Sequence, residues 1–155
     1  MIVYRLIRQR YQDTPLSAQG AFLVGGRWNP PGYPILYTSA TPELSLLEVL
    51  VHLNPADPKP AFCWVVLEVP EQGDTVQAVD LTPNWYETYQ YRTTQVHLRA
   101  WLSQPSCITV QVPSAIVELS ANYLIHTAHP AFSDQVHLLD IVPCRVDSRL
   151  LKTAQ

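Results

Sequence analysis

The stretch GGRWNPPGYPILYTSATPELSLLEVLVHL, residues 25–53, combines a glycine pair, a short apolar run and a leucine-rich segment. The apolar run at residues 35–37 predicts a strand, because proline precedes it and polar residues follow it. Thr41 is suited to cap a helix and Pro42 to occupy its first position, where no backbone N–H is needed. An Asn-Pro pair follows Leu53 and cannot continue a helix, so the sequence predicts a helix from Pro42 to about Leu53.

Glu48 is the unusual residue of this predicted helix. Three and four positions away from it lie Leu44, Ser45, Val51 and His52. A helix that is apolar on nearly all sides is expected to be buried, and a buried carboxylate is costly unless it is paired or used. Two interpretations are open: Glu48 pairs with an arginine for structural reasons, or it is a catalytic acid.

A glycine-flanked arginine and a tyrosine accompany this carboxylate. Gly25 and Gly26 allow a positive φ or a close approach of the backbone to a ligand, and Arg27 supplies a fork of donors suited to phosphate or carboxylate. Each side chain also has a structural interpretation. Arg27 could be the ion-pair partner of Glu48, and Tyr37 could be an ordinary core aromatic residue.

The stretch resembles the defining block of the RES domain family, which is named after its Arg, Glu and Ser residues. The first two correspond to Arg27 and Glu48, and the serine corresponds to Ser114 in the segment VPSAIV. The resemblance continues through Asn122, Tyr123, His129-Pro130 and the closing segment 146–150. It covers nearly the whole chain and implies a single RES domain, residues 1–155.

This resemblance implies a fold similar to the ADP-ribosyltransferases, with a cleft for NAD. Cleavage of the bond between ribose and nicotinamide passes through an oxocarbenium-like transition state, as in glycoside hydrolysis. A phosphate anchor, a platform for the nicotinamide and a carboxylate near the developing charge would accelerate it. By resemblance, Arg27 binds the phosphates or the ribose, Tyr37 stacks on the nicotinamide, and Glu48 faces the ribosyl cation. Ser114 could bond Arg27, Glu48 or a phosphate or could be a plain turn residue, and Asn122 either orients a site group or caps a turn.

The function implied by the resemblance is that of a toxin in a type II toxin–antitoxin pair. It would hydrolyse or phosphorolyse NAD, or transfer ADP-ribose to a protein, with NAD⁺ as substrate and no further cofactor. The expected partner is an Xre-type helix-turn-helix antitoxin that covers the cleft. One alternative is a non-catalytic nucleotide-binding module or degenerate RES protein. A nuclease-type toxin is a second alternative, which the absence of a Lys/Arg cluster in the sequence disfavours.

The composition of the chain indicates which partners, ligands and location to expect. Charged residues make up 15% of the chain, against roughly a quarter in typical domains, which suggests a surface partly covered by a partner or another copy. The net charge of −3 without a basic cluster predicts no direct binding of nucleic acid. We expect no metal site, because no carboxylate or cysteine completes a ligand set near His126, His129 and His137. With no secretory signal and no membrane-spanning run in the sequence, we expect a cytoplasmic protein.

Short apolar runs and two helical patterns predict an α+β domain around a bent, mostly antiparallel sheet, and the resemblance adds that the sheet is split. The predicted strands are residues 2–7, 35–37, 61–69, 76–81, 107–112, 123–125 and 138–142. The second predicted helix spans residues 85–103. The segment 8–20 is polar and predicts a loop, and 55–60 predicts a proline-rich connection.

Overall fold

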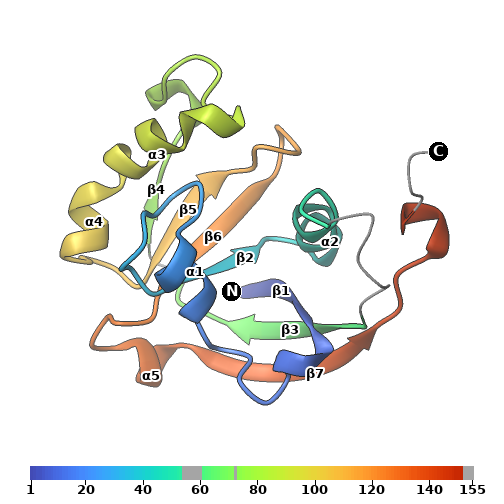
Figure 1. Cartoon of the computed structure of the whole chain (residues 1–155). Helices are drawn as coiled ribbons and strands as arrows, with labels where there is room; N and C mark the ends of the chain where they lie inside the picture. Colours follow the sequence, from blue (N-terminus) through green and yellow to red (C-terminus); the bar gives the residue numbers. More distant parts are fainter. Residues whose placement is uncertain (54–60, 72, 152–155) are drawn as a thin grey trace.

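The computed structural model describes residues 1–53, 61–71 and 73–151, and within them seven strands form a single sheet (Figure 1). Their order across the sheet is β4-β5-β6-β2-β1-β3-β7. The strands are β1 Ile2–Arg8, β2 Ile35–Ser39, β3 Phe62–Glu68, β4 Asp74–Thr75, β5 Thr109–Pro113, β6 Ala121–His126 and β7 His137–Cys144. All neighbours are antiparallel except β4 and β5, which run parallel.

Short helices accompany the sheet. The α-helices of the described residues are α1 Gln19–Val24, α2 Pro42–Leu50, α3 Tyr91–His97, α4 Arg99–Ser103 and α5 Phe132–Gln135. Single 3-10 turns occur at η1 Gln9–Tyr11, η2 Ala78–Asp80, η3 Thr88–Gln90 and η4 Ser148–Leu151. Figure 1 shows α3 and α4 beside β5 and β6, and α2 beside β1 and β2. The predicted α+β class with a mostly antiparallel sheet is confirmed.

The sheet is split between its central strand β2 and the neighbouring strand β1. β1 and β2 pair only where Tyr4 lies opposite Ser39, whereas β1 pairs with β3 along its whole length. Near the split, the backbone N–H of Leu6 donates to Ser45 Oγ of α2 at 2.9 Å. The Ser45 side chain thus accepts a hydrogen bond from a backbone N–H of β1 that has no partner in β2. This bond fixes α2 against the split.

Helix α2 begins as the sequence predicts and ends earlier. Thr41 Oγ1 accepts the N–H of Leu44 at 3.3 Å, and Pro42 occupies the first position. The helix ends at Leu50, and Val51 forms its C-cap. Its burial differs from the prediction: Leu44 and Ser45 are its only buried residues, and Glu48 is half-buried. The helix covers the split with one face only, so its other faces meet the cleft and the solvent.

Two apolar clusters lie against the sheet and follow the alternation of the strands. Leu36 belongs to the cluster that also contains Val3 and Val65, from β1 and β3. Its neighbour Ile35 points to the other face and belongs to the cluster that contains Trp101 of α4. Because successive side chains of a strand point to opposite faces, Tyr37 and Ser39 share the face of Ile35. That face carries the cleft described below.

Two predicted elements are wrong in the β4–α4 region. The predicted strand 76–81 contains only the turn η2, because the chain leaves the sheet after the short strand β4. The predicted helix 85–103 begins only at Tyr91 and is interrupted at Leu98. The carbonyls of residues 85–87 accept the Arg27 side chain, and that of Glu87 also accepts the N–H of Gln90 at 3.1 Å, the spacing of a 3-10 turn and not of an α-helix.

The remaining predictions agree with the structure except near the N-terminus. Part of the predicted loop 8–20 forms η1, and its end forms the start of α1. The other strand predictions match the observed strands to within a few residues at each end. The predicted proline-rich connection 55–60 lies outside the described residues. Among the residues described, every helix is too short or too polar to cross a bilayer.

Candidate active site

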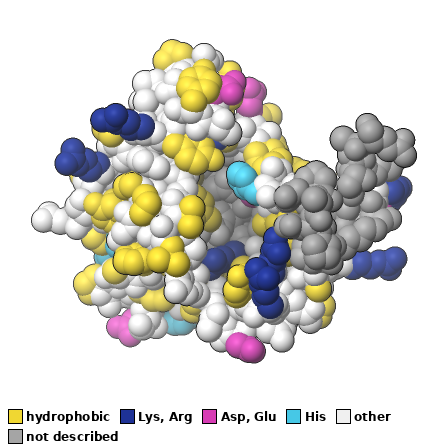
Figure 2. All heavy atoms as spheres, viewed as in Figure 1, with side chains coloured by type: hydrophobic (Ala, Val, Ile, Leu, Met, Phe, Trp, Pro, Cys, Tyr) yellow, Lys and Arg dark blue, Asp and Glu magenta, His cyan; other side chains and the backbone are white. Residues whose placement is uncertain are grey.

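A cleft with a volume of about 630 Å³ opens on the face of the sheet that carries Tyr37. Its walls come from α1 and the loop after it, from β2, from α2, from the segment 86–91 and from the connection between β5 and β6. Figure 2 shows a hollow on this face of the molecule. Four of the predicted site residues line the cleft: Arg27, Tyr37, Glu48 and Asn122. A volume of this size falls in the usual range of small-molecule sites, about 300–1,000 Å³.

Glu48 is held in this cleft by two neutral donors. Its Oε1 accepts hydrogen bonds from Asn122 Nδ2 at 2.5 Å and from Ser114 Oγ at 3.2 Å. Among the described residues no bond reaches Oε2, and no ion pair joins Glu48 to Arg27. The alternative in which these two residues form a structural ion pair is therefore not supported by the described residues. Neutral donors fix the carboxylate without cancelling its charge.

Asn122 is the middle residue of a chain of hydrogen bonds that joins β2, β6 and α2. Its Oδ1 accepts the hydroxyl of Ser39 at 2.7 Å, so its amide nitrogen is directed to Glu48. Ser39 lies directly opposite Asn122 in the β2–β6 pair. The Asn122 side chain therefore bonds Glu48 and Ser39, which agrees with the expectation that it orients another side chain. Sequence reasoning missed Ser39, although its alternation with Tyr37 along one strand placed both on the same face.

Ser114 combines the two roles that the sequence left open. Its Oγ accepts the backbone N–H groups of Ile116 and Val117, both at 3.1 Å, and donates to Glu48. The first two bonds form the turn after β5, and the third fixes the carboxylate. Ser114 is 2% exposed and does not line the cleft, and its side chain bonds the carboxylate of Glu48, which does.

Tyr37 lines the cleft with its ring while its hydroxyl is held by the loop after α1. The hydroxyl accepts the N–H of Trp28 at 3.1 Å and donates to Asn29 Oδ1 at 2.7 Å. A Cβ at Gly26 would come within 2.7 Å of this hydroxyl, so only glycine allows the loop to pack here. Burial raises the pKa of the Tyr37 phenol, which keeps it neutral. Asn29 was not among the residues expected at the site. It is fully buried, and its side chain bonds both the Tyr37 hydroxyl and the carbonyl of Ala21 in α1.

Arg27 binds a neighbouring segment of the chain. Its Nη1 donates to the carbonyls of Trp85 at 2.7 Å and Glu87 at 3.1 Å, and its Nη2 donates to that of Tyr86 at 2.7 Å. Its guanidinium carbon lies 4.7 Å from the centre of the Tyr91 ring. Burial lowers the pKa of the Arg27 guanidinium, and its nearest acidic neighbours act in the opposite direction. The structure thus places Arg27 in the cleft wall, where part of its donor fork is already used.

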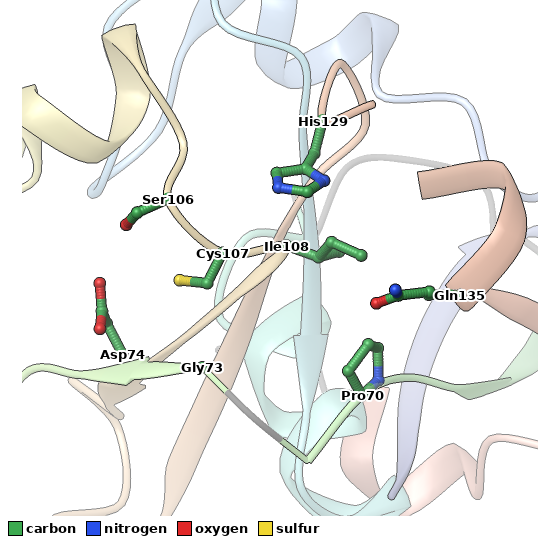
Figure 3. Close-up of a pocket in the computed structure, with 8 residues that line it drawn as sticks. All are labelled: Pro70, Gly73, Asp74, Ser106, Cys107, Ile108, His129 and Gln135. Atoms are coloured by element: carbon green, nitrogen blue, oxygen red, sulfur yellow. The ribbon is translucent and has the colours of Figure 1, made fainter. Parts of the chain in front are cut away.

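A second cavity of about 320 Å³ lies near β4 and α5, lined by residues that include Asp74, Cys107 and His129 (Figure 3). The Cys107 thiol donates to the carbonyl of Thr109 at 3.1 Å, and His129 Nδ1 accepts the N–H of Ala131 at 3.1 Å. These groups therefore serve the local fold. Within the described part of the chain, no group of three or more His, Cys, Asp or Glu side chains is arranged to hold a metal ion.

Comparison with known proteins gives a family and several relatives. The RES domain family matches residues 2–147. A Toxin Res of Pseudomonas putida is 35% identical over 97% of this chain and 99% of its own length. A Toxin Res of Photorhabdus laumondii is 31% identical over 98% of each chain. A Prs ADP-ribosylating toxin of a Sphingobium species is 32% identical over 77% of each chain.

A solved structure shares the fold. It is a chain of the M. tuberculosis MbcT–MbcA toxin–antitoxin complex, superposed with a TM-score of 0.73 over 92% of this chain and 83% of that chain. The two sequences are 20% identical, so this similarity concerns the fold alone.

Proposed function

The chain belongs to the RES domain family, and from that premise we propose that it is the toxin of a toxin–antitoxin pair that cleaves NAD⁺ between ribose and nicotinamide. Relatives named as toxins match it over nearly their whole length, which supports the first part of this proposal. The chemistry of the cleft supports the second part.

The observation that carries the proposal is the way in which Glu48 is held. Its carboxylate lies in the cleft wall, fixed by Ser114 and Asn122 and paired with no cation among the described residues. A preorganised negative charge of this kind stabilises an oxocarbenium-like transition state, because the ribose becomes positively charged as nicotinamide leaves. An ion pair would weaken this effect. The leaving group is cationic in the substrate and needs no proton.

The other side chains take supporting roles in this proposal. Tyr37 provides an apolar surface beside the carboxylate, and Arg27 offers its remaining N–H groups to phosphate or ribose oxygens. NAD⁺ is the substrate and no additional cofactor takes part. The acceptor is water, phosphate or a protein side chain. The name of the Sphingobium relative makes ADP-ribose transfer to a protein a specific candidate.

The proposed partner is a helix-turn-helix antitoxin of the Xre type that covers the cleft in the cytoplasm. The solved neighbour comes from a toxin–antitoxin complex. Apolar side chains stand at the cleft wall with large exposed fractions, 57% for Val51 and 47% for Tyr86. Exposed apolar groups next to a binding cleft favour coverage by another protein. A further copy of the chain remains a second predicted partner.

Incubation of the purified protein with NAD⁺ tests the proposal through release of free nicotinamide. We expect release by the native chain, and addition of phosphate or of candidate protein acceptors then identifies the acceptor by its ADP-ribosylated product. A folded protein that binds NAD⁺ and releases no nicotinamide would support the non-catalytic alternative. That alternative is favoured by one observation, the use of Arg27 by three backbone carbonyls.

A further inference from the structure

The segment that Arg27 binds presents an aromatic side chain to the cleft. Tyr86 lies between the turn at Asn84 and η3, outside any helix or strand. Its side chain lines the cleft and is 47% exposed. A large aromatic ring left open at a cavity wall is a common way of receiving a planar ligand group.

The backbone beneath this ring is fixed from two sides. On one side, Arg27 donates to the carbonyl of Tyr86 and to those of its two neighbours. On the other side, Trp85 is 9% exposed and packs against Trp28, with ring centres 5.8 Å apart. The segment is therefore anchored in the core although it has no regular secondary structure.

The ring itself is also held in place. The Tyr86 hydroxyl donates to Asn84 Oδ1 at 3.1 Å, and the ring meets Trp85 edge to face with centres 6.2 Å apart. Asn84 has a φ of 62°, the only positive φ of a non-glycine residue in the described chain. Asparagine tolerates this left-handed conformation better than most residues. The turn at Asn84 thus brings its own side chain to the phenol.

We propose that Tyr86 is a stacking platform for a planar ring of the bound dinucleotide, the adenine or the nicotinamide, and that Arg27 and Asn84 are its positioning residues. This inference rests on the proposed function. A ring fixed at both its backbone and its hydroxyl loses little freedom on binding, which favours stacking. Tyr37 is less suited to the role, because it is more buried than Tyr86 and leaves less of its ring open to a ligand.

Binding measurements in a Glu48→Gln background test the proposal without turnover. Titration calorimetry with NAD⁺, AMP and nicotinamide mononucleotide is carried out for this background and for Tyr86→Ala, Tyr86→Leu and Tyr86→Phe added to it. Stacking of a base on an aromatic residue is worth about 1–3 kcal/mol, so Ala and Leu should each weaken NAD⁺ binding by about 5- to 150-fold. Tyr86→Phe should change the affinity for NAD⁺ by less than about threefold, since phenylalanine keeps the aromatic ring. If the affinity for AMP falls together with that for NAD⁺, the stacked ring is the adenine, and if the affinity for nicotinamide mononucleotide falls instead, it is the nicotinamide.

Tyr89→Ala is the matched control. Tyr89 belongs to the same segment, is 71% exposed and does not line the cleft, so its removal should leave binding unchanged. The role of Asn84 is tested by Asn84→Gly, which keeps the positive φ available. It should weaken NAD⁺ binding by no more than Tyr86→Phe does when Tyr86 is present, and have no further effect in Tyr86→Phe, where the phenol bond is already absent.

The outcomes separate this proposal from the proposed function. Unchanged NAD⁺ affinity in Tyr86→Ala, with nicotinamide release by the native chain, would overturn the platform and leave the function standing. Tyr86-dependent binding without nicotinamide release would keep the platform and overturn the catalysis. No binding of any of the three nucleotides by the folded protein would overturn both. If Tyr86→Ala fails to fold, as judged by circular dichroism, the affinity of Tyr86→Leu is compared in its place, and an unchanged value there would overturn the platform.

Discussion

The cleft has two walls that are built in different ways. One wall consists of β2 and α2, which are regular elements with local signals such as the Thr41 cap. The other consists of residues 84–91, most of which lie in turns, held by partners that are distant in sequence. Arg27 reaches the carbonyl of Tyr86 across 59 positions. The start of α2 in the first wall is marked by residues close together in sequence, whereas the second wall depends on the side chain of Arg27 in the loop after α1.

Helix α3 bonds the loop after α1 to the second wall. Thr94 Oγ1 donates to the carbonyl of Arg27, and Gln95 Nε2 donates to that of Gly26 at 2.8 Å. The loop after α1 is thereby bonded to the second wall through its backbone as well as through the Arg27 side chain. The difference between the walls predicts that changes in the first alter chemistry most, and that changes in the second alter binding and local order.

The largest effect is expected for Glu48→Gln, in the first wall. Glutamine keeps an oxygen for Ser114 and Asn122 and lacks the negative charge, so kcat for nicotinamide release should fall at least about a hundredfold while the fold remains. Glu43→Gln is the control, because Glu43 is exposed in the first turn of the same helix. Equal turnover by both variants would remove Glu48 from the chemistry. A loss of kcat that merely follows a loss of melting temperature would assign it a structural role.

A smaller effect is expected for Asn122→Ala, which removes the support behind Glu48. The buried Ser39 hydroxyl loses its acceptor and Glu48 loses a donor, so we expect a loss of about 1–3 kcal/mol in the free energy of unfolding. The carboxylate should also become mobile and kcat should fall about tenfold, by analogy with other misplaced catalytic groups. Chemical denaturation and the nicotinamide assay measure the two effects. Reduced stability with full kcat would show that Asn122 supports the strands alone.

Arg27→Lys probes the second wall. A lysine ammonium cannot reach three carbonyls in the geometry of the guanidinium fork, so residues 84–91 should become more mobile. Hydrogen–deuterium exchange should become faster in this segment and stay unchanged in β2. Arg92→Lys, at an exposed position of α3, should leave both unchanged. Exchange rates equal to those of the native chain would show that the second wall does not depend on Arg27.

The smallest effect concerns His126, which is buried behind the walls against Trp101. Burial lowers its pKa below the ordinary value of 6.5, so the unfolded chain takes up a proton at this residue at a higher pH than the folded chain does. The free energy of unfolding should therefore decrease below pH 6.5, by at most about 1.4 kcal/mol per pH unit for this one residue. His126→Phe should flatten this dependence. His137→Gln, at an exposed site of β7, should leave the pH dependence of the free energy of unfolding as it is in the native chain. The same pH dependence in both variants would contradict the role of burial.

The sequence predicts the first wall well because its signals lie within a few residues of each other. Thr41 and Pro42 mark the start of α2, and the alternation around Tyr37 marks β2. The predicted burial of α2 was wrong because composition shows that a helix is apolar and does not show how many of its faces find partners. The half-exposed Glu48 follows from the split sheet, which one face of α2 is enough to cover.

The second wall could not be predicted from local patterns. Helical spacing from Trp85 onward indicated a helix, and the carbonyls of that segment bind a side chain from the loop after α1 instead. No local signal reports such a bond. The single RES domain over residues 1–155 and the covering antitoxin stay predictions, as does the role of each site residue.

The most direct test of the central claim is a crystal structure of the Glu48→Gln variant soaked with NAD⁺. We predict the intact dinucleotide in the cleft, with its nicotinamide ribose within hydrogen-bonding distance of the side chain at position 48. A dinucleotide bound elsewhere on the molecule, or held in the cleft with that ribose remote from position 48, would contradict the account.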